Sequence, residues 1–280
     1  MECLPPVSLP GDSAADPNRE SMTKPRAVCW FSCGVTSAIA ARLTLDLYRG
    51  HEIRIVYCDT RSEHPDNYRF MDEWQEHLNH PIERIGSDEY RDIWDVFDKT
   101  RWLVGPQGAR CTAELKKRVR FNFQEPDDIQ VFGFDSSEND RAERFRQNNP
   151  EIHLETPLIA LGRSKLSCAE EVMRAGIELP EIYRLGFRNA NCIGCPKGQM
   201  GYWNKIRSVF PDVFARMSKV ERDLDVAINK SYAGDGERKR VFLDELDPDA
   251  GNYEAEPSIE CGLSCGVQET LFGDDGGGNS

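Results

Sequence analysis

The sequence predicts an α/β fold: a doubly wound, mostly parallel sheet followed by a C-terminal appendage of helices and cysteines. Short apolar runs rich in β-branched and aromatic residues alternate with segments of helical periodicity, a pattern typical of βαβ units. Several runs end directly in small or polar residues, as strands do where an open α/β sheet binds its ligand. A chain of 280 residues can also bury one sizeable core and support an appendage.

Four segments are expected along the chain. Residues 1–25 are rich in Pro, Ser and Asp, which predicts a disordered arm. Residues 26–190 are expected to form the α/β domain, and residues 191–246 a cysteine knuckle with a helical appendage. Residues 247–280 end in a run of glycines and are expected to be a flexible C-terminal segment.

Composition restricts the classes of partner. The 48 acidic residues outnumber the 35 basic ones, giving a net charge of −13, so the molecule as a whole repels nucleic acid. An RNA or DNA contact would need a local basic patch. No apolar run is long enough to span a bilayer, and residues 1–25 lack the layout of a signal peptide. Ten cysteines without an export signal indicate a reducing compartment, so a cytoplasmic location and core, metal-binding or catalytic thiols are expected.

The first predicted strand, residues 27–31, leads through a turn of small residues into a helical segment ending near Gly50. The apolar positions of that segment share one helical face: Ile39, Leu43 and Leu47. Backbone N–H groups and the helix dipole converge at such a helix N-terminus, so the turn can bind phosphate. The candidate binding residues are Ser32, Cys33, Gly34, Val35, Thr36 and Ser37. The alternative is an ordinary turn in which Ser or Thr caps the helix.

The stretch Ser-Cys-Gly-Val-Thr-Ser resembles the PP-loop Ser-Gly-Gly-x-(Asp/Thr)-Ser of the adenine-nucleotide α-hydrolase-like superfamily. Its members include phosphoadenylyl sulfate (PAPS) and adenylyl sulfate (APS) reductases, and ATP pyrophosphatases that thiolate RNA or amidate GMP precursors. The resemblance implies a Rossmann-like fold that binds an adenine nucleotide. Cys33 departs from the pattern at the first glycine position, where a left-handed backbone would be strained.

The second predicted strand, residues 53–58, ends in Asp59 and Thr60, which would lie beside the first turn. A strand ending in Asp-Thr lies at the nucleotide pocket in this superfamily, so the resemblance implies that both residues line it. The alternative is that Asp59 only caps a loop. The next helix carries a core-facing stripe of Tyr68, Phe70, Met71, Trp74 and Leu78, and a third strand is expected at residues 82–85.

A glycine-rich loop and a strongly basic segment follow, with five cations among residues 110–120. The segment is similar to the Cys-Thr-x-x-(Leu/Arg)-Lys stretch of PAPS-reductase-like proteins, which faces the anionic end of the substrate. This implies that Lys116 binds an anion; the alternative is a solvated basic helix face. Iron–sulfur APS reductases carry two adjacent cysteines here, whereas this chain has Arg110 before Cys111, which weighs against a cluster of that type.

The strand expected at residues 129–134 leads into a polar segment that resembles the family's strand–Gly–x–x–x–Glu–x–x–Arg element. Within it, Arg141 is the candidate clamp on phosphate or sulfate, because a guanidinium fork matches those oxygens. The alternative is a surface helix stabilised by Glu–Arg pairs.

Two cysteine pairs lie beyond this domain. Cys192 and Cys195 form a Cys-x-x-Cys knuckle, and Cys261 and Cys265 lie near the C-terminus. None of the five histidines is close to either pair in sequence, which favours an all-thiolate zinc site or an iron–sulfur cluster over a mixed Cys/His site. These four cysteines are the candidate metal ligands.

The Glu-Cys-Gly-Leu stretch around Cys261 also resembles the C-terminal Glu-Cys-Gly-Leu-His segment of sulfonucleotide reductases, where the cysteine is the nucleophile. The resemblance implies that the Cys261 thiolate attacks the sulfate sulfur, with the basic segment lowering its pKa. This chain has Ser264 where the family has His, followed by Cys265. Cys265 is either a resolving thiol or, together with Cys261, a metal ligand.

The expected function is that of a sulfonucleotide-reductase-like enzyme, similar to short PAPS-reductase-family proteins often encoded by phages. Lys116 and Arg141 would hold the anionic group of the substrate, Cys261 would attack sulfur, and a thiol donor such as a thioredoxin-like protein would supply electrons. Two alternatives stay open: an ATP-pyrophosphatase-type sulfurtransferase with a cysteine-bound metal cluster, and a non-catalytic nucleotide-binding module. The motifs do not distinguish PAPS, APS and ATP.

Overall fold

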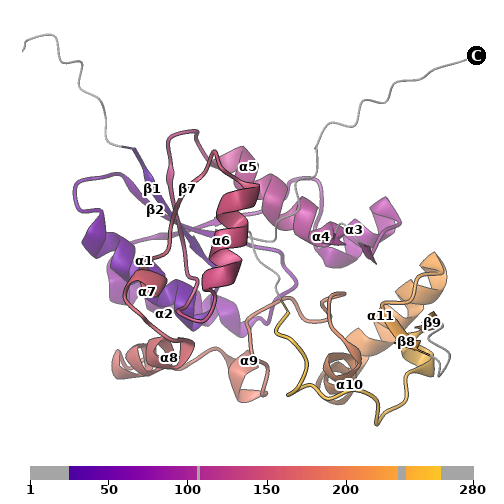
Figure 1. The fold of residues 1–280 in the computed structure, drawn as a ribbon. Helices are drawn as coiled ribbons and strands as arrows, with labels where there is room; N and C mark the ends of the chain where they lie inside the picture. Colours follow the sequence, from indigo (N-terminus) through magenta and orange to yellow (C-terminus); the bar gives the residue numbers. More distant parts are fainter. Residues whose placement is uncertain (1–24, 106–107, 233–237, 260–280) are drawn as a thin grey trace, which may run out of the picture.

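The computed structural model describes residues 25–105, 108–232 and 238–259. Its centre is a five-stranded, all-parallel sheet in the order β3-β2-β1-β6-β7 (Figure 1), which confirms the predicted doubly wound α/β fold. The strands are β1 (Ala27–Phe31), β2 (Ile53–Cys58), β3 (Ile82–Ile85), β6 (Ile129–Phe132) and β7 (His153–Glu155). The chain crosses from β1 to β2 and β3 on one side and returns to β6 and β7 on the other. The order therefore reverses beside β1, the point at which such sheets bind ligands.

Helices cover both faces of the sheet, and β1 shows why. Its alternate side chains point to opposite faces, with Cys29 and Phe31 in one core cluster and Val28 and Trp30 in the other. The first cluster packs against α1, α2, α7 and α8, and the second against α5 and α6. The bounds are α1 (Val35–Leu47), α2 (Asp66–Leu78), α5 (Arg118–Phe123), α6 (Asn139–Asn148), α7 (Pro157–Ala160) and α8 (Lys165–Arg174).

A further hydrophobic core, here called the second core, lies apart from the two clusters on the sheet and joins the C-terminal helices to the segment that follows β3. Figure 1 shows α10 and α11 near α3, away from the sheet. Its helices are α3 (Ile93–Thr100), α4 (Arg110–Thr112), α9 (Glu181–Arg184), α10 (Met200–Val209), α11 (Pro211–Leu224) and a 3₁₀ turn (Leu243–Glu245). Two short hairpins accompany them: β4 (Val104–Gly105) with β5 (Gly108–Ala109), and β8 (Asn229–Tyr232) with β9 (Arg238–Val241). Among the described residues, no helix combines the length and apolar content needed to cross a bilayer.

The predicted strands β1, β2 and β3 are confirmed at their predicted bounds, and β6 ends two residues earlier, at Phe132. Two details of α1 were wrong. The helix ends at Leu47 with Tyr48 as its C-cap, so Gly50 lies beyond the cap. Leu47 is 59% exposed because it sits in the last helical turn, whereas the sequence placed it on the buried face with Ile39.

Candidate functional site

Residues 32–37, here called the 32–37 loop, comprise the turn after β1 and the first turn of α1, and the hydroxyl of Ser37, a residue only 3% exposed, closes them. The Ser37 Oγ accepts hydrogen bonds from the backbone N–H of Ser32 at 3.0 Å and from the Ser32 hydroxyl at 3.1 Å. It donates to the carbonyl of Gly34 at 2.8 Å. Gly34 is the N-cap of α1 and makes no side-chain cap hydrogen bond, so the positive end of this helix faces the loop. A helix N-terminus of this kind can bind an anion, and binding of phosphate by this loop stays a prediction.

Cys33 takes the left-handed backbone conformation that glycine would occupy in the PP-loop pattern, with φ of 54°. For a residue with a Cβ this conformation costs about 1–2 kcal/mol. The side chain is fully buried, and burial raises the pKa of the thiol well above its usual value, with the Glu63 carboxylate adding to the effect. Cys33 therefore shapes the loop as a protonated, inaccessible thiol.

Gly133, directly after β6, brings a second strand end against this loop. A Cβ on Gly133 would lie 2.8 Å from both Cα and N of Ser37, and 2.9 Å from the carbonyl carbon of Thr36. Backbone atoms cannot rotate away from such an overlap, so only glycine fits here. The carboxyl end of β6 therefore packs directly against the first turn of α1.

A cavity of about 440 Å³, here called the sheet-edge cavity, opens at the carboxyl ends of β1, β2 and β6. Its size lies within the range of small-molecule sites. The loop contributes Ser32, Gly34, Thr36 and Ser37 to its lining. Aromatic surface comes from Trp30, Tyr57, Phe132, Phe134 and Tyr183, and charge from Glu63, Lys116, Asp135, Glu138, Arg141 and Lys165. The predicted loop, Lys116 and Arg141 thus share one cavity.

Lys116 reaches the cavity from a π-helical turn, Ala113–Lys117, between α4 and α5. Single π turns inside α-helices are frequent at functional sites. The Lys116 side chain is 7% exposed, and its Nζ lies 3.1 Å from Oε1 of Glu63, which is 3% exposed. The other oxygen of Glu63 accepts hydrogen bonds from the Tyr57 hydroxyl at 2.8 Å and the Asn67 amide at 3.1 Å. Because these hydrogen bonds fix the carboxylate of Glu63, its ion pair keeps the Lys116 ammonium in the wall of the sheet-edge cavity, which the 32–37 loop also lines.

Arg141 and Lys165 add two further cations. Arg141, on α6, pairs with Glu138 at 2.5 Å and lies over the Phe134 ring, 5.1 Å from its centroid. Lys165, at the start of α8, donates to Oδ1 of Asn189 at 2.7 Å, and burial lowers the pKa of its ammonium. Protein carboxylates already form ion pairs with Lys116 and Arg141. An anionic ligand would therefore bind here by displacing those carboxylates from the cations.

Asp59 and Thr60 lie at the end of β2 as predicted, but neither is among the residues that line the sheet-edge cavity. Asp59 is 5% exposed and pairs with Nη2 of Arg84 at 2.6 Å, and it accepts a hydrogen bond from the Tyr68 hydroxyl at 3.1 Å. The Thr60 Oγ1 lies 3.1 Å from the sulfur of Cys192. In this structure the two residues anchor the loop after β2, and their contact with a nucleotide stays a prediction.

The knuckle cysteines, Cys192 and Cys195, are buried in the second core together with Cys111. The hydroxyl of Tyr202 fixes the knuckle by accepting the backbone N–H groups of Gly194 and Cys195, each at 3.0 Å. Within the described part of the chain, no three His, Cys, Asp or Glu side chains are arranged to hold a metal ion. The other two predicted ligands, Cys261 and Cys265, lie outside the described residues. The four-cysteine metal site therefore stays a prediction.

Several cavity residues were missed by the sequence reasoning. Glu63 follows β2 in an irregular segment and meets a lysine 53 positions later, a pairing that no periodicity encodes. Lys165 begins a helix and has the appearance of a solvated lysine in the sequence. Ser258 and Ile259 also line the cavity, although they come from the C-terminal segment expected to be flexible. For Glu63, the only available signal was its position four residues after Asp59.

Comparisons with known proteins carry little functional information. No protein-family model matches the chain. An uncharacterized protein of Methanocaldococcus jannaschii is 25% identical over 216 residues, which is 73% of this chain. The match covers 43% of that protein, so the chain spans less than half the length of this curated relative. Because the relative's name states no activity, function has to be argued from the site itself.

Proposed function

We propose that this chain is a PP-loop adenine-nucleotide enzyme of the PAPS reductase family, which reduces PAPS or APS to sulfite. One observation supports this most: the 32–37 loop, Lys116, Arg141 and Ile259 all line the same cavity. Ile259 precedes Cys261 by two residues. The described part of the chain therefore reaches the cavity two residues before the proposed nucleophile.

The binding mode follows from the charges and surfaces of the cavity. The phosphate of the nucleotide would accept hydrogen bonds from N–H groups at the start of α1, where the helix dipole favours negative charge. The sulfate oxygens would displace Glu63 from its ion pair with Lys116. They would likewise displace Glu138 from its ion pair with Arg141. The rings of Trp30 and Phe134 line the same cavity and offer apolar faces on which adenine can stack.

The proposed reaction has two steps. The Cys261 thiolate attacks the sulfate sulfur; an S–S bond forms while the S–O bond to phosphate breaks, and the nucleotide leaves with that oxygen and the bonding electron pair. A second thiol, from Cys265 or an external dithiol, then attacks the Cys261 sulfur and releases sulfite. Two thiols become one disulfide as sulfur(VI) is reduced to sulfur(IV), and a thioredoxin-like dithiol reduces the disulfide. Lys116 stabilises the charge on the sulfonate group throughout.

Trapping the intermediate tests this proposal. Wild type, Cys261→Ser and Cys265→Ser are mixed anaerobically with PAPS or APS, without reductant, and analysed by peptide mass spectrometry. We expect the wild type or Cys265→Ser to carry an added SO₃ group on the peptide containing Cys261, and Cys261→Ser to carry none. Sulfite release by Cys261→Ser at the wild-type rate would overturn the assignment of the nucleophile.

A second candidate is an ATP-pyrophosphatase-type sulfurtransferase, in which ATP adenylates an acceptor and a cysteine-bound cluster delivers sulfur. The observation in its favour is that Cys192, one of the predicted cluster ligands, contacts Thr60 at the end of β2, where a nucleotide is predicted to bind. Release of pyrophosphate from ATP in the presence of an acceptor, without sulfite from PAPS or APS, would favour this candidate.

A further inference from the structure

Lys165 lines the sheet-edge cavity but takes no part in the proposed binding mode. Its Nζ donates to Oδ1 of Asn189 at 2.7 Å and to the backbone carbonyl of Arg188. Within the part of the chain that the structure describes, these partners of Lys165 are neutral oxygens, whereas Lys116 and Arg141 each pair with a carboxylate. An ammonium has three N–H donors, so a third N–H remains for a ligand in the cavity.

Two carboxylates near Lys165 are bonded to other groups. The carboxylate of Glu138 pairs with Arg141 at 2.5 Å, and Oδ1 of Asp135 accepts hydrogen bonds from the N–H and the hydroxyl of Ser137. Burial lowers the pKa of the Lys165 ammonium, and the charges of Glu138 and Asp135 oppose this shift only in part. A bound anion would compensate for the lost hydration of the ammonium, and neither carboxylate would have to be displaced.

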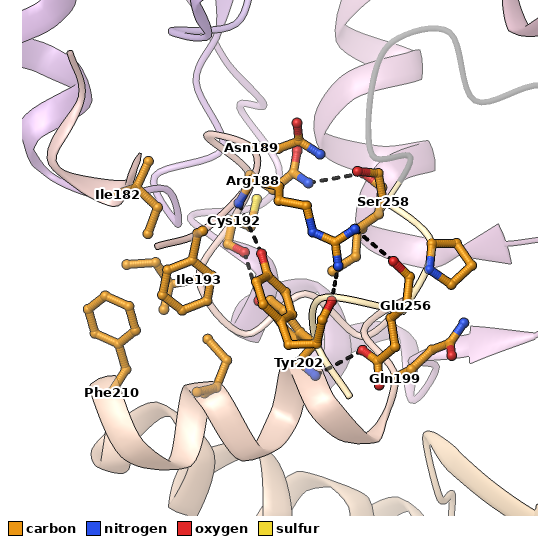
Figure 2. Close-up of a pocket in the computed structure, with 16 residues that line it drawn as sticks. Ile182, Arg188, Asn189, Cys192, Ile193, Gln199, Tyr202, Phe210, Glu256 and Ser258 are labelled. Carbon is orange, nitrogen blue, oxygen red and sulfur yellow. Dashed lines mark hydrogen bonds between the residues drawn. The ribbon is translucent and has the colours of Figure 1, made fainter. Parts of the chain in front are cut away.

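The oxygens that accept from Lys165 belong to a segment that is itself held in place. In Figure 2, the Arg188 guanidinium points toward the backbone near Glu256 and donates to the carbonyls of Glu256, at 2.7 Å, and Tyr253. The backbone N–H of Arg188 donates to the Tyr253 hydroxyl at 2.9 Å. Because Arg188 is fixed at both its side chain and its N–H, its carbonyl and the neighbouring Asn189 form a fixed pair of acceptors. The ammonium of Lys165 is therefore preorganised for a ligand.

Tyr183 connects Lys165 with the 32–37 loop. The Lys165 Nζ lies over the Tyr183 ring, 5.2 Å from its centroid, and Tyr183 lines the same cavity. The hydroxyl at the other end of this side chain is 3.3 Å from the position that a Cβ on Gly34, the N-cap of α1, would take. One tyrosine thus reaches from the ammonium to the helix end at which phosphate is proposed to bind. Since a tyrosine side chain is shorter than a nucleotide, one nucleotide can place anionic groups at both positions.

We propose that Lys165, positioned by Asn189 and by the Arg188 carbonyl, binds a phosphate group of the nucleotide other than the group at the 32–37 loop. The inference rests on the proposed function, because it takes the ligand of the sheet-edge cavity to be an adenine nucleotide. That phosphate belongs either to the ribose, as in adenosine 3′,5′-bisphosphate and PAPS, or to a 5′-polyphosphate chain, as in ATP. Lys165 would in this way distinguish nucleotides that the sequence motifs do not.

Calorimetry with AMP, adenosine 3′,5′-bisphosphate and ATP tests this role without turnover. We expect at least one of the two ligands with additional phosphate to bind wild type at least tenfold more tightly than AMP. Lys165→Gln keeps N–H donors for the Arg188 carbonyl but removes the charge, so it should abolish most of this gain while the Kd for AMP changes less than threefold. Lys165→Arg keeps the charge and should retain part of the gain. A gain with the bisphosphate assigns the ribose phosphate, and a gain with ATP assigns the polyphosphate chain.

The matched control is Lys205→Gln. The Lys205 Nζ also donates to a backbone carbonyl, that of Gly186 at 2.8 Å, and lies over the Phe187 ring, but Lys205 is not among the residues that line the cavity. This variant should leave all three Kd values unchanged, and thermal unfolding without nucleotide checks that each variant is folded. If the three nucleotides bind wild type equally, or if Lys165→Gln keeps the full gain, the role of Lys165 is overturned while nucleotide binding stands. If none of them binds wild type, the proposed function fails together with this inference.

Discussion

Replacing Gly133 with alanine perturbs the proposed binding site through a single methyl group. The new Cβ would lie 2.8–2.9 Å from three backbone atoms of Thr36 and Ser37. Side-chain rotation cannot relieve these contacts, so the 32–37 loop or the end of β6 has to move. Overpacking of this kind costs about 1–3 kcal/mol of unfolding free energy.

The substitution should also remove most of the stabilisation that a bound nucleotide gives to the folded protein. A nucleotide present at about 100 times its Kd stabilises the folded protein by about 2.7 kcal/mol. If displacement of the loop weakens binding about 100-fold, the same concentration equals the new Kd. The stabilisation then falls to RT ln 2, about 0.4 kcal/mol.

The assay is thermal unfolding with and without PAPS, APS or ATP. The matched control is Gly162→Ala, where φ is +61° and nothing lies within 4 Å of the added Cβ. This variant carries the left-handed strain of about 1–2 kcal/mol but should keep the full nucleotide-dependent shift. A full shift in Gly133→Ala would refute the conclusion that the end of β6 shapes the binding loop.

Three further predictions concern single side chains. Ser37→Ala removes the hydroxyl that closes the 32–37 loop. It should raise the Kd for nucleotide, measured by calorimetry, about tenfold, which corresponds to a loss of about 1–1.5 kcal/mol. The control Thr44→Val removes a buried hydroxyl bonded within α1 and should leave this Kd unchanged. Tyr202→Phe leaves the N–H groups of Gly194 and Cys195 without their acceptor and should cost about 1–3 kcal/mol in urea unfolding; a cost below about 0.5 kcal/mol would contradict this. Burial raises the pKa of Glu221 to about 7, so the folded state retains a proton that the unfolded state releases above pH 4.5. The free energy of unfolding of wild type, relative to that of Glu221→Gln, should therefore fall by about 3 kcal/mol between pH 4.5 and 8. Equal pH profiles of the two proteins would contradict this.

The centre of the sheet was predictable because β1 and β6 are buried along their whole length and consist mainly of apolar residues. Residues 27–31, 53–58 and 82–85 form strands at the predicted bounds. The edge strand β7 was missed, since His153–Glu155 has three residues and an exposed histidine. The basic helix was predicted as one element, but the π-helical turn at Ala113–Lys117 divides it, and no residue pattern marks such a turn.

The lining of the sheet-edge cavity was predictable where a motif follows a strand, as for the 32–37 loop and Arg141. It was not predictable where packing brings distant segments together. Glu63 and Lys116 meet through the folding of β2 and the π-helical turn, and both are almost fully buried. Residues 252–259 have few apolar residues and no periodicity, and their path is held by Arg188 and by the N-terminus of α10. Those contacts join segments more than 50 residues apart, so no local sequence pattern predicts them.

The most direct test of the whole account is sulfite release from PAPS and APS, offered separately to anaerobically purified protein with a dithiol donor. We expect sulfite from one or both nucleotides with wild type, and none with Cys261→Ser. Absence of sulfite from both nucleotides with wild type would contradict it. Pyrophosphate release from ATP would then favour the sulfurtransferase, and tight nucleotide binding without turnover would favour a non-catalytic module.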